Sequence, residues 1–193
     1  EGARKFRAGG RIRRPLDLAR LRQFIRELGR ASHGTSRVYL TGGASALLEG
    51  WRDATIDVDL KLVPESDEVL RAIPRLKEEL EINVELAAPS DFIPELPAWE
   101  ERCRFVAQEG GLAVYQYDFY SQALSKLERR HQKDLTDVQA MLDRGLIERL
   151  KLQQLYDAIE PELFRYPAID PPAFRRAVEL ITQAPQDEIA EAP

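Results

Sequence analysis

Two aspartates on one side of an apolar strand constrain this chain more than any other feature. Residues 55–63 alternate polar and apolar side chains, and Asp57 and Asp59 occupy two of the polar positions. Because residues i and i+2 of a strand point the same way, we expect the two carboxylates to share one face of a sheet. The neighbouring residues expected to enter the core are Ile56, Val58 and Leu60. Paired carboxylates repel each other unless a cation lies between them, and Mg²⁺ that also binds substrate phosphates suits such oxygen ligands.

A glycine pair and a third carboxylate accompany this strand. Gly42 and Gly43 follow the apolar stretch 36–41 and open a short helical pattern, and thirteen residues separate the pair from the first aspartate. Without a Cβ atom the backbone can approach a phosphate closely, and a helix start offers free N–H groups. Glu85 lies on another candidate strand. Together these residues favour metal-assisted phosphoryl or nucleotidyl transfer; the simpler interpretation is a tight turn and a solvent-facing glutamate.

Composition indicates a globular protein. The chain has 193 residues and a mass of 22.0 kDa, which suits one domain or a domain with a small helical appendage. Hydrophobic residues make up 44% of it, yet no apolar run approaches the ~20 residues of a membrane span. A single cysteine, Cys103, excludes an intrachain disulfide. With no secretory signal pattern, we expect a cytoplasmic protein without a membrane partner.

The charge is unevenly distributed along the chain. Residues 1–30 hold ten Lys or Arg and three acids, a net charge of +7, whereas the remainder holds 18 basic and 30 acidic residues, a net charge of −12. A basic N-terminal arm on an acidic body attracts a polyanion such as RNA. The alternative is a solubilising tail, or a surface that docks on the chain's own acidic body.

Hydrophobic periodicity predicts an α/β or α+β fold with a small mixed sheet, flanking helices and a helical C-terminal part. Helices are predicted over residues 15–32, 43–51, 66–81, 118–145, 146–159 and 170–184, and strands over 36–41, 55–63, 82–87, 103–108 and 112–117. The last two strands form a hairpin around Gly110 and Gly111. Pro74 is expected to kink or split its helix. The domain organisation that follows is a basic arm (1–14), a core (15–120) and a helical region (121–193).

The glycine pair, the Asp-Val-Asp strand and the later glutamate resemble the signature of the DNA polymerase beta-like nucleotidyltransferase superfamily. Over roughly residues 36–150 the chain is similar to bacterial uncharacterised nucleotidyltransferase-like domains related to AbiEii-type toxins. This resemblance implies a two-metal mechanism with Mg²⁺, or Mn²⁺ in its place. Asp57 and Asp59 would bind both ions. Glu85 would bind the catalytic ion and help to deprotonate the incoming hydroxyl.

Three residues near the motif are candidates for nucleotide binding beside the glycine pair. Ser45 offers a hydroxyl to a phosphate, or simply caps the short helix. Arg52 and Thr55 precede the aspartate strand and would contact phosphate or fix the loop. The alternative for Arg52 is a surface ion pair with Asp53 or Glu49.

The resemblance adds residues from the helical part. In AbiEii-type enzymes a lysine and a later aspartate complete the site, and Lys126 with Asp134 or Asp137 occupies that kind of position here. Lys126 would neutralise phosphate charge. The alternative is an exposed charged helix face on which the aspartates pair with Arg130 or Lys133.

The function implied is transfer of a nucleoside monophosphate from an NTP such as ATP to a hydroxyl on RNA, a protein or a small molecule. A toxin that modifies tRNA, with an antitoxin protein as partner, is implied by the resemblance alone. A nucleotide-binding module without turnover, or a protein-interaction module on the same fold, is the alternative.

Overall fold

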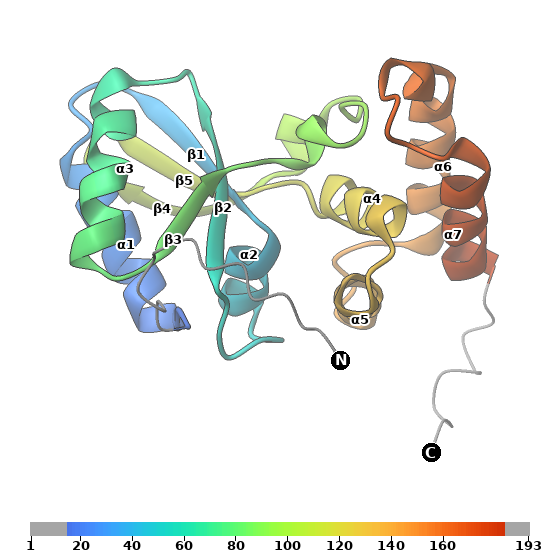
Figure 1. Ribbon diagram of the computed structural model, residues 1–193, viewed down its shortest axis with the longest axis horizontal. Helices are drawn as coiled ribbons and strands as arrows, with labels where there is room; N and C mark the ends of the chain where they lie inside the picture. Colours follow the sequence, from blue (N-terminus) through green and yellow to red (C-terminus); the bar gives the residue numbers. More distant parts are fainter. Residues whose placement is uncertain (1–14, 184–193) are drawn as a thin grey trace, which may run out of the picture.

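Five strands form one mixed sheet beside a helical C-terminal part (Figure 1). The computed structural model describes residues 15–183, so the basic arm over residues 1–14 lies outside the described part. The strands are β1 (Ser36–Thr41), β2 (Asp57–Val63), β3 (Asn83–Leu86), β4 (Arg104–Glu109) and β5 (Leu112–Gln116). Their order in the sheet is β3-β2-β1-β5-β4, with β1 antiparallel to β2 and parallel to β5. β2 and β3 are parallel, and β4 and β5 form the predicted hairpin.

The helices confirm the predicted α/β class and the helical C-terminal part. They are α1 (Leu18–Arg30), α2 (Gly42–Glu49), α3 (Asp67–Glu79), α4 (Phe119–Arg129), α5 (Gln132–Asp143), α6 (Arg149–Ile159) and α7 (Pro171–Gln183). Short 3₁₀ turns connect several of them, namely η1 (Pro89–Asp91), η2 (Trp99–Arg102) and η3 (Glu160–Arg165). Residues 15–183 contain no helix whose length and hydrophobicity would let it cross a membrane.

One hydrophobic core lies between the sheet and helices α1 and α3 (Figure 1). Leu21 and Phe24 of α1 and Leu76 of α3 are fully buried there, together with Val58 and Leu60 of β2. Each such side chain contributes roughly 1.5–3 kcal/mol by leaving water. Since alternate residues of β2 enter this core, the polar residues between them must point to the opposite face.

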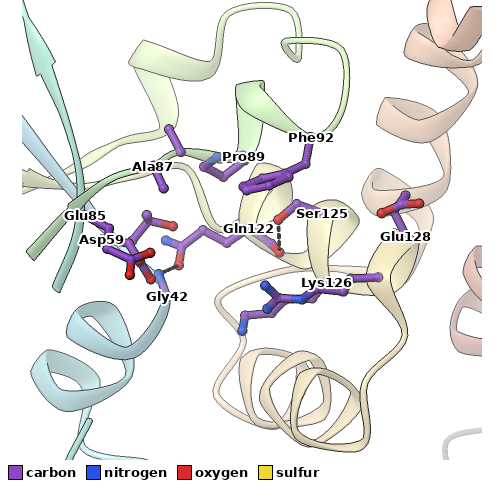
Figure 2. A pocket seen from close by; sticks show the side chains of 13 residues that line it. Gly42, Asp59, Glu85, Ala87, Pro89, Phe92, Gln122, Ser125, Lys126 and Glu128 are labelled. Atoms are coloured by element: carbon purple, nitrogen blue, oxygen red, sulfur yellow. Dashed lines mark hydrogen bonds between the residues drawn. The ribbon is translucent and has the colours of Figure 1, made fainter. Parts of the chain in front are cut away.

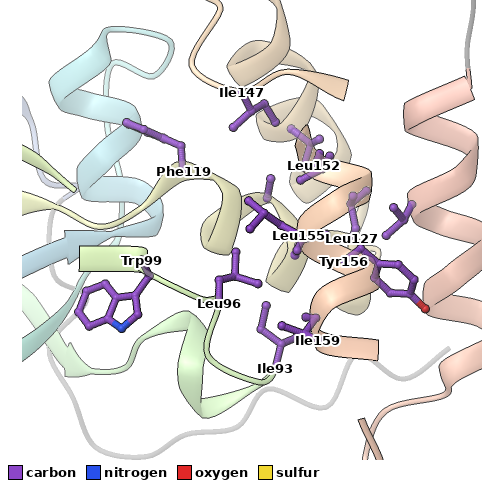
Figure 3. Packing of buried hydrophobic residues seen from close by; sticks show 14 of the residues in the cluster. Ile93, Leu96, Trp99, Phe119, Leu127, Ile147, Leu152, Leu155, Tyr156 and Ile159 are labelled. Atoms are coloured by element: carbon purple, nitrogen blue, oxygen red, sulfur yellow. The ribbon is translucent and has the colours of Figure 1, made fainter. Parts of the chain in front are cut away.

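A second core joins the sheet to the helical part (Figure 3). Tyr39 of β1 is buried with Trp99 and Tyr117. The rings of Trp99 and Tyr117 stack on each other at a centroid distance of 4.4 Å. The same cluster continues into Leu127 of α4 and Leu155 of α6. The helical part is therefore packed onto the sheet through shared apolar contacts.

One local expectation is wrong, and another is wrong in part. Ile56 does not enter the core and is 68% exposed, because β2 begins only at Asp57 and no neighbouring strand pairs with Ile56. Pro74 does not split its helix, since α3 runs without a break through it. The proline ring lies on the exposed side, while Ile73 and Leu76 on either side are buried. Tertiary packing thus outweighs the loss of one helical hydrogen bond.

The helix predicted over 118–145 is in fact two helices. Arg130 has a φ of 59°, in the left-handed region, and its N–H caps α4 by donating to the carbonyl of Lys126 at 2.9 Å. His131 is extended and precedes α5. The chain turns there, and Val138 and Met141 of α5 pack into the second core.

Candidate active site

Three carboxylates lie on one face at the same end of β2 and β3. The parallel register places Asp59 beside Glu85 and Asp57 beside Asn83. Thr41, the last residue of β1, lies beside Asp59 on the other side. Because directly paired residues share a face, the register gathers the predicted acids where β1 ends and α2 begins.

An unpredicted amide holds two of these acids in place. Asn83 Nδ2 donates to Asp57 Oδ1 at 2.6 Å and to Glu85 Oε1 at 3.1 Å. The side chain therefore bridges carboxylates that would otherwise repel each other. Nothing in the alternation of residues 82–87 indicates this role.

Asp59 occupies an environment that disfavours its charge. Burial raises its pKa to about 6, and the nearby charges of Glu85 and Asp57 act in the same direction. Arg129 and Lys126 counteract this rise only in part. Such a carboxylate gains from a cation at neutral pH, because a cation stabilises the ionised form.

The glycine pair allows α2 to begin against the acidic strand. Gly42 has a φ of 59°, and a Cβ atom on it would lie 2.6 Å from Asp59 Oδ2. A Cβ atom on Gly43 would overlap the side chain of Thr55. Only glycine fits at both positions, so the first turn of α2 lies directly beside the carboxylate row.

A pocket of about 150 Å³ lies between this row and α4 (Figure 2). Besides Glu128, four polar residues of α4 line it, at the i, i+3, i+4 and i+7 spacing of one helix face. These residues are Gln122, Ser125, Lys126 and Arg129. The acids and the cations thus face each other across one pocket, an arrangement that suits a ligand carrying both phosphates and metal ions.

The cations of α4 are held by two buried aspartates of α5. Lys126 Nζ lies 2.6 Å from Asp137 Oδ2 and 3.3 Å from Asp134 Oδ1. Arg129 makes a two-pronged contact with Asp134, at 2.7 and 2.8 Å. Burial would raise the pKa of Asp134, but the hydrogen bond from Arg129 and the charges of Lys126 and Arg129 outweigh it, so this pKa lies below its usual value. The aspartates pair with these cations and not with Arg130 or Lys133.

Arg52 connects the sheet to the same network. Its guanidinium binds both oxygens of Asp137, at 2.8 and 3.0 Å, and the indole N–H of Trp51 donates to Asp137 at 3.1 Å. The alternative pairs with Asp53 or Glu49 do not form, since Glu49 pairs instead with Arg104 at 3.0 Å. Arg52 lies outside the lining of the pocket and fixes α5 against the loop before β2.

Gln122 joins α4 to the start of α2. Its Oε1 accepts a hydrogen bond from the N–H of Gly42 at 3.0 Å, and its Nε2 donates to the carbonyl of Tyr117 at 2.8 Å. Ser45 is fully buried, donates to the carbonyl of Leu40 and accepts from Gln122, each at 3.2 Å. Its hydroxyl therefore supports Gln122 from behind and does not line the pocket.

The structure separates the predicted residues into those that line the pocket and those behind it. Gly42, Asp59, Glu85 and Lys126 line it. The predicted residues outside the lining are Gly43, Ser45, Arg52, Thr55, Asp57, Asp134 and Asp137. Arg129 and Gln122 were missed, although their helical spacing from Lys126 was a usable signal. Phe92, which also lines the pocket, carries no such signal in the sequence.

The donor set fits divalent cations that a substrate also ligates. In the described part of the chain, no three His, Cys, Asp or Glu side chains converge closely enough to hold an ion by themselves. Mg²⁺ in phosphoryl-transfer sites needs only one or two carboxylates and completes its shell with phosphates and water. Asp59, destabilised as an anion by its surroundings, and Glu85 beside it supply such a pair.

Comparison with known proteins gives one finding for this chain. A family model described as "Nucleotidyltransferase of unknown function (DUF6036)" matches residues 17–171. No curated protein and no solved structure matches the chain significantly. The matched residues contain the sheet, the carboxylate row, the glycine turn and all of α4 and α5.

Proposed function

We propose, from the premise that this chain belongs to the nucleotidyltransferase family of unknown function DUF6036, that it transfers a nucleoside monophosphate from an NTP to a hydroxyl acceptor with the help of Mg²⁺. One observation carries the proposal. Asp59 and Glu85 lie side by side on paired strands and share a pocket with the glycine turn and the α4 cations. An acidic row opposite a cationic helix face suits a metal-bound polyphosphate.

Different residues of the pocket would bind different parts of such a substrate. Lys126 and Arg129 supply positive charge toward the phosphates. Because Gly42 has no Cβ atom, a phosphate can approach the backbone closely at the start of α2. Asp57, Asp59 and Glu85 are the residues that would hold Mg²⁺. When bound, the ions stabilise the attacking and leaving oxygens of an in-line displacement.

The proposed reaction needs no reactant besides the NTP and the acceptor. The acceptor oxygen forms a bond to the α-phosphorus, and the bond from that phosphorus to the bridging oxygen of the β-phosphate breaks. Pyrophosphate leaves, and the hydroxyl proton would pass to a carboxylate of the row, for which the exposed Glu85 is the candidate. The kinship with DNA polymerase beta-like enzymes, an RNA acceptor and a toxin role with an antitoxin partner are finer predictions within this proposal.

Calorimetric titration of the four NTPs, with and without Mg²⁺, tests the proposal. We expect Mg²⁺-dependent binding to the wild type that is lost in the double variant Asp57→Asn/Asp59→Asn. Asp67→Asn is the matched control, because the Asp67 side chain is 83% exposed at the start of α3. Transfer is then followed with an α-labelled NTP and a pool of RNA and protein acceptors.

Different outcomes separate the candidate functions. Mg²⁺–NTP binding without transfer to any offered acceptor would favour the nucleotide-binding module. Absence of NTP binding to the folded wild type would refute the proposal and favour an interaction module.

A further inference from the structure

We infer that Phe92 and Glu128 form the nucleobase subsite of this pocket, with Phe92 stacking on the base and Glu128 accepting a hydrogen bond from an exocyclic amino group. The inference rests on the proposed function, because it names where the base of the NTP would lie. It assigns a specificity role to two residues that the motif does not contain.

Phe92 presents a partly exposed aromatic ring to the pocket. It is 52% exposed, although the next residue, Ile93, is buried in the second core. The segment that carries the ring is well anchored: the N–H groups of Phe92 and Ile93 both donate to the carbonyl of Pro89 at 3.0 Å. Asp91 closes the same turn by accepting from the N–H of Ala88 at 2.8 Å. An exposed ring on a rigid turn is a platform on which a base can stack.

The wall beside Phe92 is apolar. Ala87, Ala88 and Pro89 line the pocket next to the ring, and Figure 2 shows Ala87, Pro89 and Phe92 along one side, facing Gln122 and Ser125 of α4. Phosphates gain nothing from such a wall, whereas the flat faces of a base do. The polar and apolar parts of one pocket thus match the two ends of a nucleotide.

Glu128 offers an acceptor at the far end. It is half-buried and lines the pocket, and no hydrogen bond or ion pair to it is found among the described residues. Burial raises the pKa of its carboxyl, while Arg130 and Arg129 counteract this. A partly desolvated carboxylate without a partner gains from a neutral N–H donor.

The order of these groups along α4 follows the order of groups in an NTP. Gln122 contacts the start of α2, Lys126 lies one turn further, and Glu128 is six residues beyond Gln122, about 9 Å along a helix axis. Figure 2 shows Asp59, Glu85 and Gly42 at one end and Glu128 at the other. Phosphates at the metal-binding end would therefore direct the base toward Phe92 and Glu128.

The test compares nucleotides with a ligand that has no base. Calorimetry measures the binding of Mg²⁺-ATP, Mg²⁺-ITP and Mg²⁺-tripolyphosphate to the wild type, Phe92→Ala and Glu128→Gln. ITP replaces the amino group of ATP by a carbonyl oxygen. Phe105→Ala is the matched control, since Phe105 is 60% exposed on β4 and does not line the pocket. Thermal melts check that each variant is folded.

We expect Phe92→Ala to weaken ATP binding about 10-fold and to leave tripolyphosphate binding unchanged within about two-fold. Glu128→Gln should reduce the preference for ATP over ITP. Unchanged ATP binding in Phe92→Ala, or a parallel loss of tripolyphosphate binding, would overturn the subsite and leave the proposed function standing. A folded wild type that binds neither ATP nor tripolyphosphate would instead overturn the proposed function.

Discussion

Asp59 is held where its own charge is disfavoured. It lies between the end of β1 and Glu85. Gly42 lies so close to it that no residue with a side chain fits at that position. With a pKa of about 6 in the folded protein against 3.8 for an unperturbed aspartate, Asp59 binds a proton more tightly when the chain is folded. Its ionisation therefore weakens the fold as the pH rises from about 4 to 6.

Asp59→Asn should stabilise the metal-free protein at neutral pH. Removing the disfavoured charge should raise the free energy of unfolding by about 1–3 kcal/mol at pH 7.5, and the gain should shrink toward zero as the pH falls to 4. Urea denaturation at several pH values measures this. Asp67→Asn, at an exposed position, serves as the control. A gain that did not change with pH would show that Asp59 is not strained by its charge.

Among the helices, the turn between α4 and α5 creates the cationic wall of the pocket. It folds Asp134 and Asp137 back onto Lys126 and Arg129, and the aspartates are almost completely buried. Buried carboxylates are tolerated only when they are paired, so the network fixes the relative position of the two helices. Arg52 extends this constraint to the loop before β2.

Lys126→Met should destabilise the protein and not merely weaken phosphate binding. In this variant Asp137 still pairs with Arg52, and Asp134 still pairs with Arg129. We therefore expect the free energy of unfolding to fall by about 2–4 kcal/mol, somewhat less than for a buried pair that loses its only partner. Thermal and chemical denaturation measure it. The double variant Lys126→Met/Asp137→Asn should recover part of the loss.

Lys133→Met is the matched control for this prediction. Lys133 lies exposed on the first turn of α5, and its replacement should change stability by no more than about 0.5 kcal/mol. Equal stability of Lys126→Met and the wild type would mean that the buried network contributes nothing to the docking of α5.

Across the whole molecule, strand β1 contributes to both cores, with Val38 and Leu40 in one and Tyr39 in the other. Tyr39 belongs to β1 in the middle of the sheet, yet its ring packs with Trp99 and Tyr117 in the cluster of the helical part. The helices therefore bury a face of the sheet that would otherwise be exposed. Such shared burial favours cooperative unfolding of the sheet and the helices.

Leu155→Ala tests this cooperativity. Leu155 is 5% exposed on α6, so truncation should cost about 2–5 kcal/mol through lost burial and a cavity. Circular dichroism and the fluorescence of Trp99 and Trp51 should report the same lowered midpoint. Two separate transitions would instead show that the core and the helical region, which the sequence analysis divides near residue 120, unfold independently.

Features that depend only on neighbouring residues follow from the amino-acid sequence alone. Strand alternation is local, so it placed Asp57 and Asp59 on one face, and β1 has the predicted bounds. The glycine pair likewise indicated a tight start for α2. Where packing opposed a local rule, as at Pro74, the predicted split of the helix does not occur.

The residues that face the carboxylate row depend on how distant parts of the chain pack together. The partners Arg52 and Asp137 are 85 residues apart, and Gly42 and Gln122 are 80 apart, so no local pattern can pair them. Phe92 reaches the pocket because the turn after β3 is anchored to a core built largely by helices. Contacts of this kind depend on how distant elements pack, and that packing depends on interactions along the whole chain.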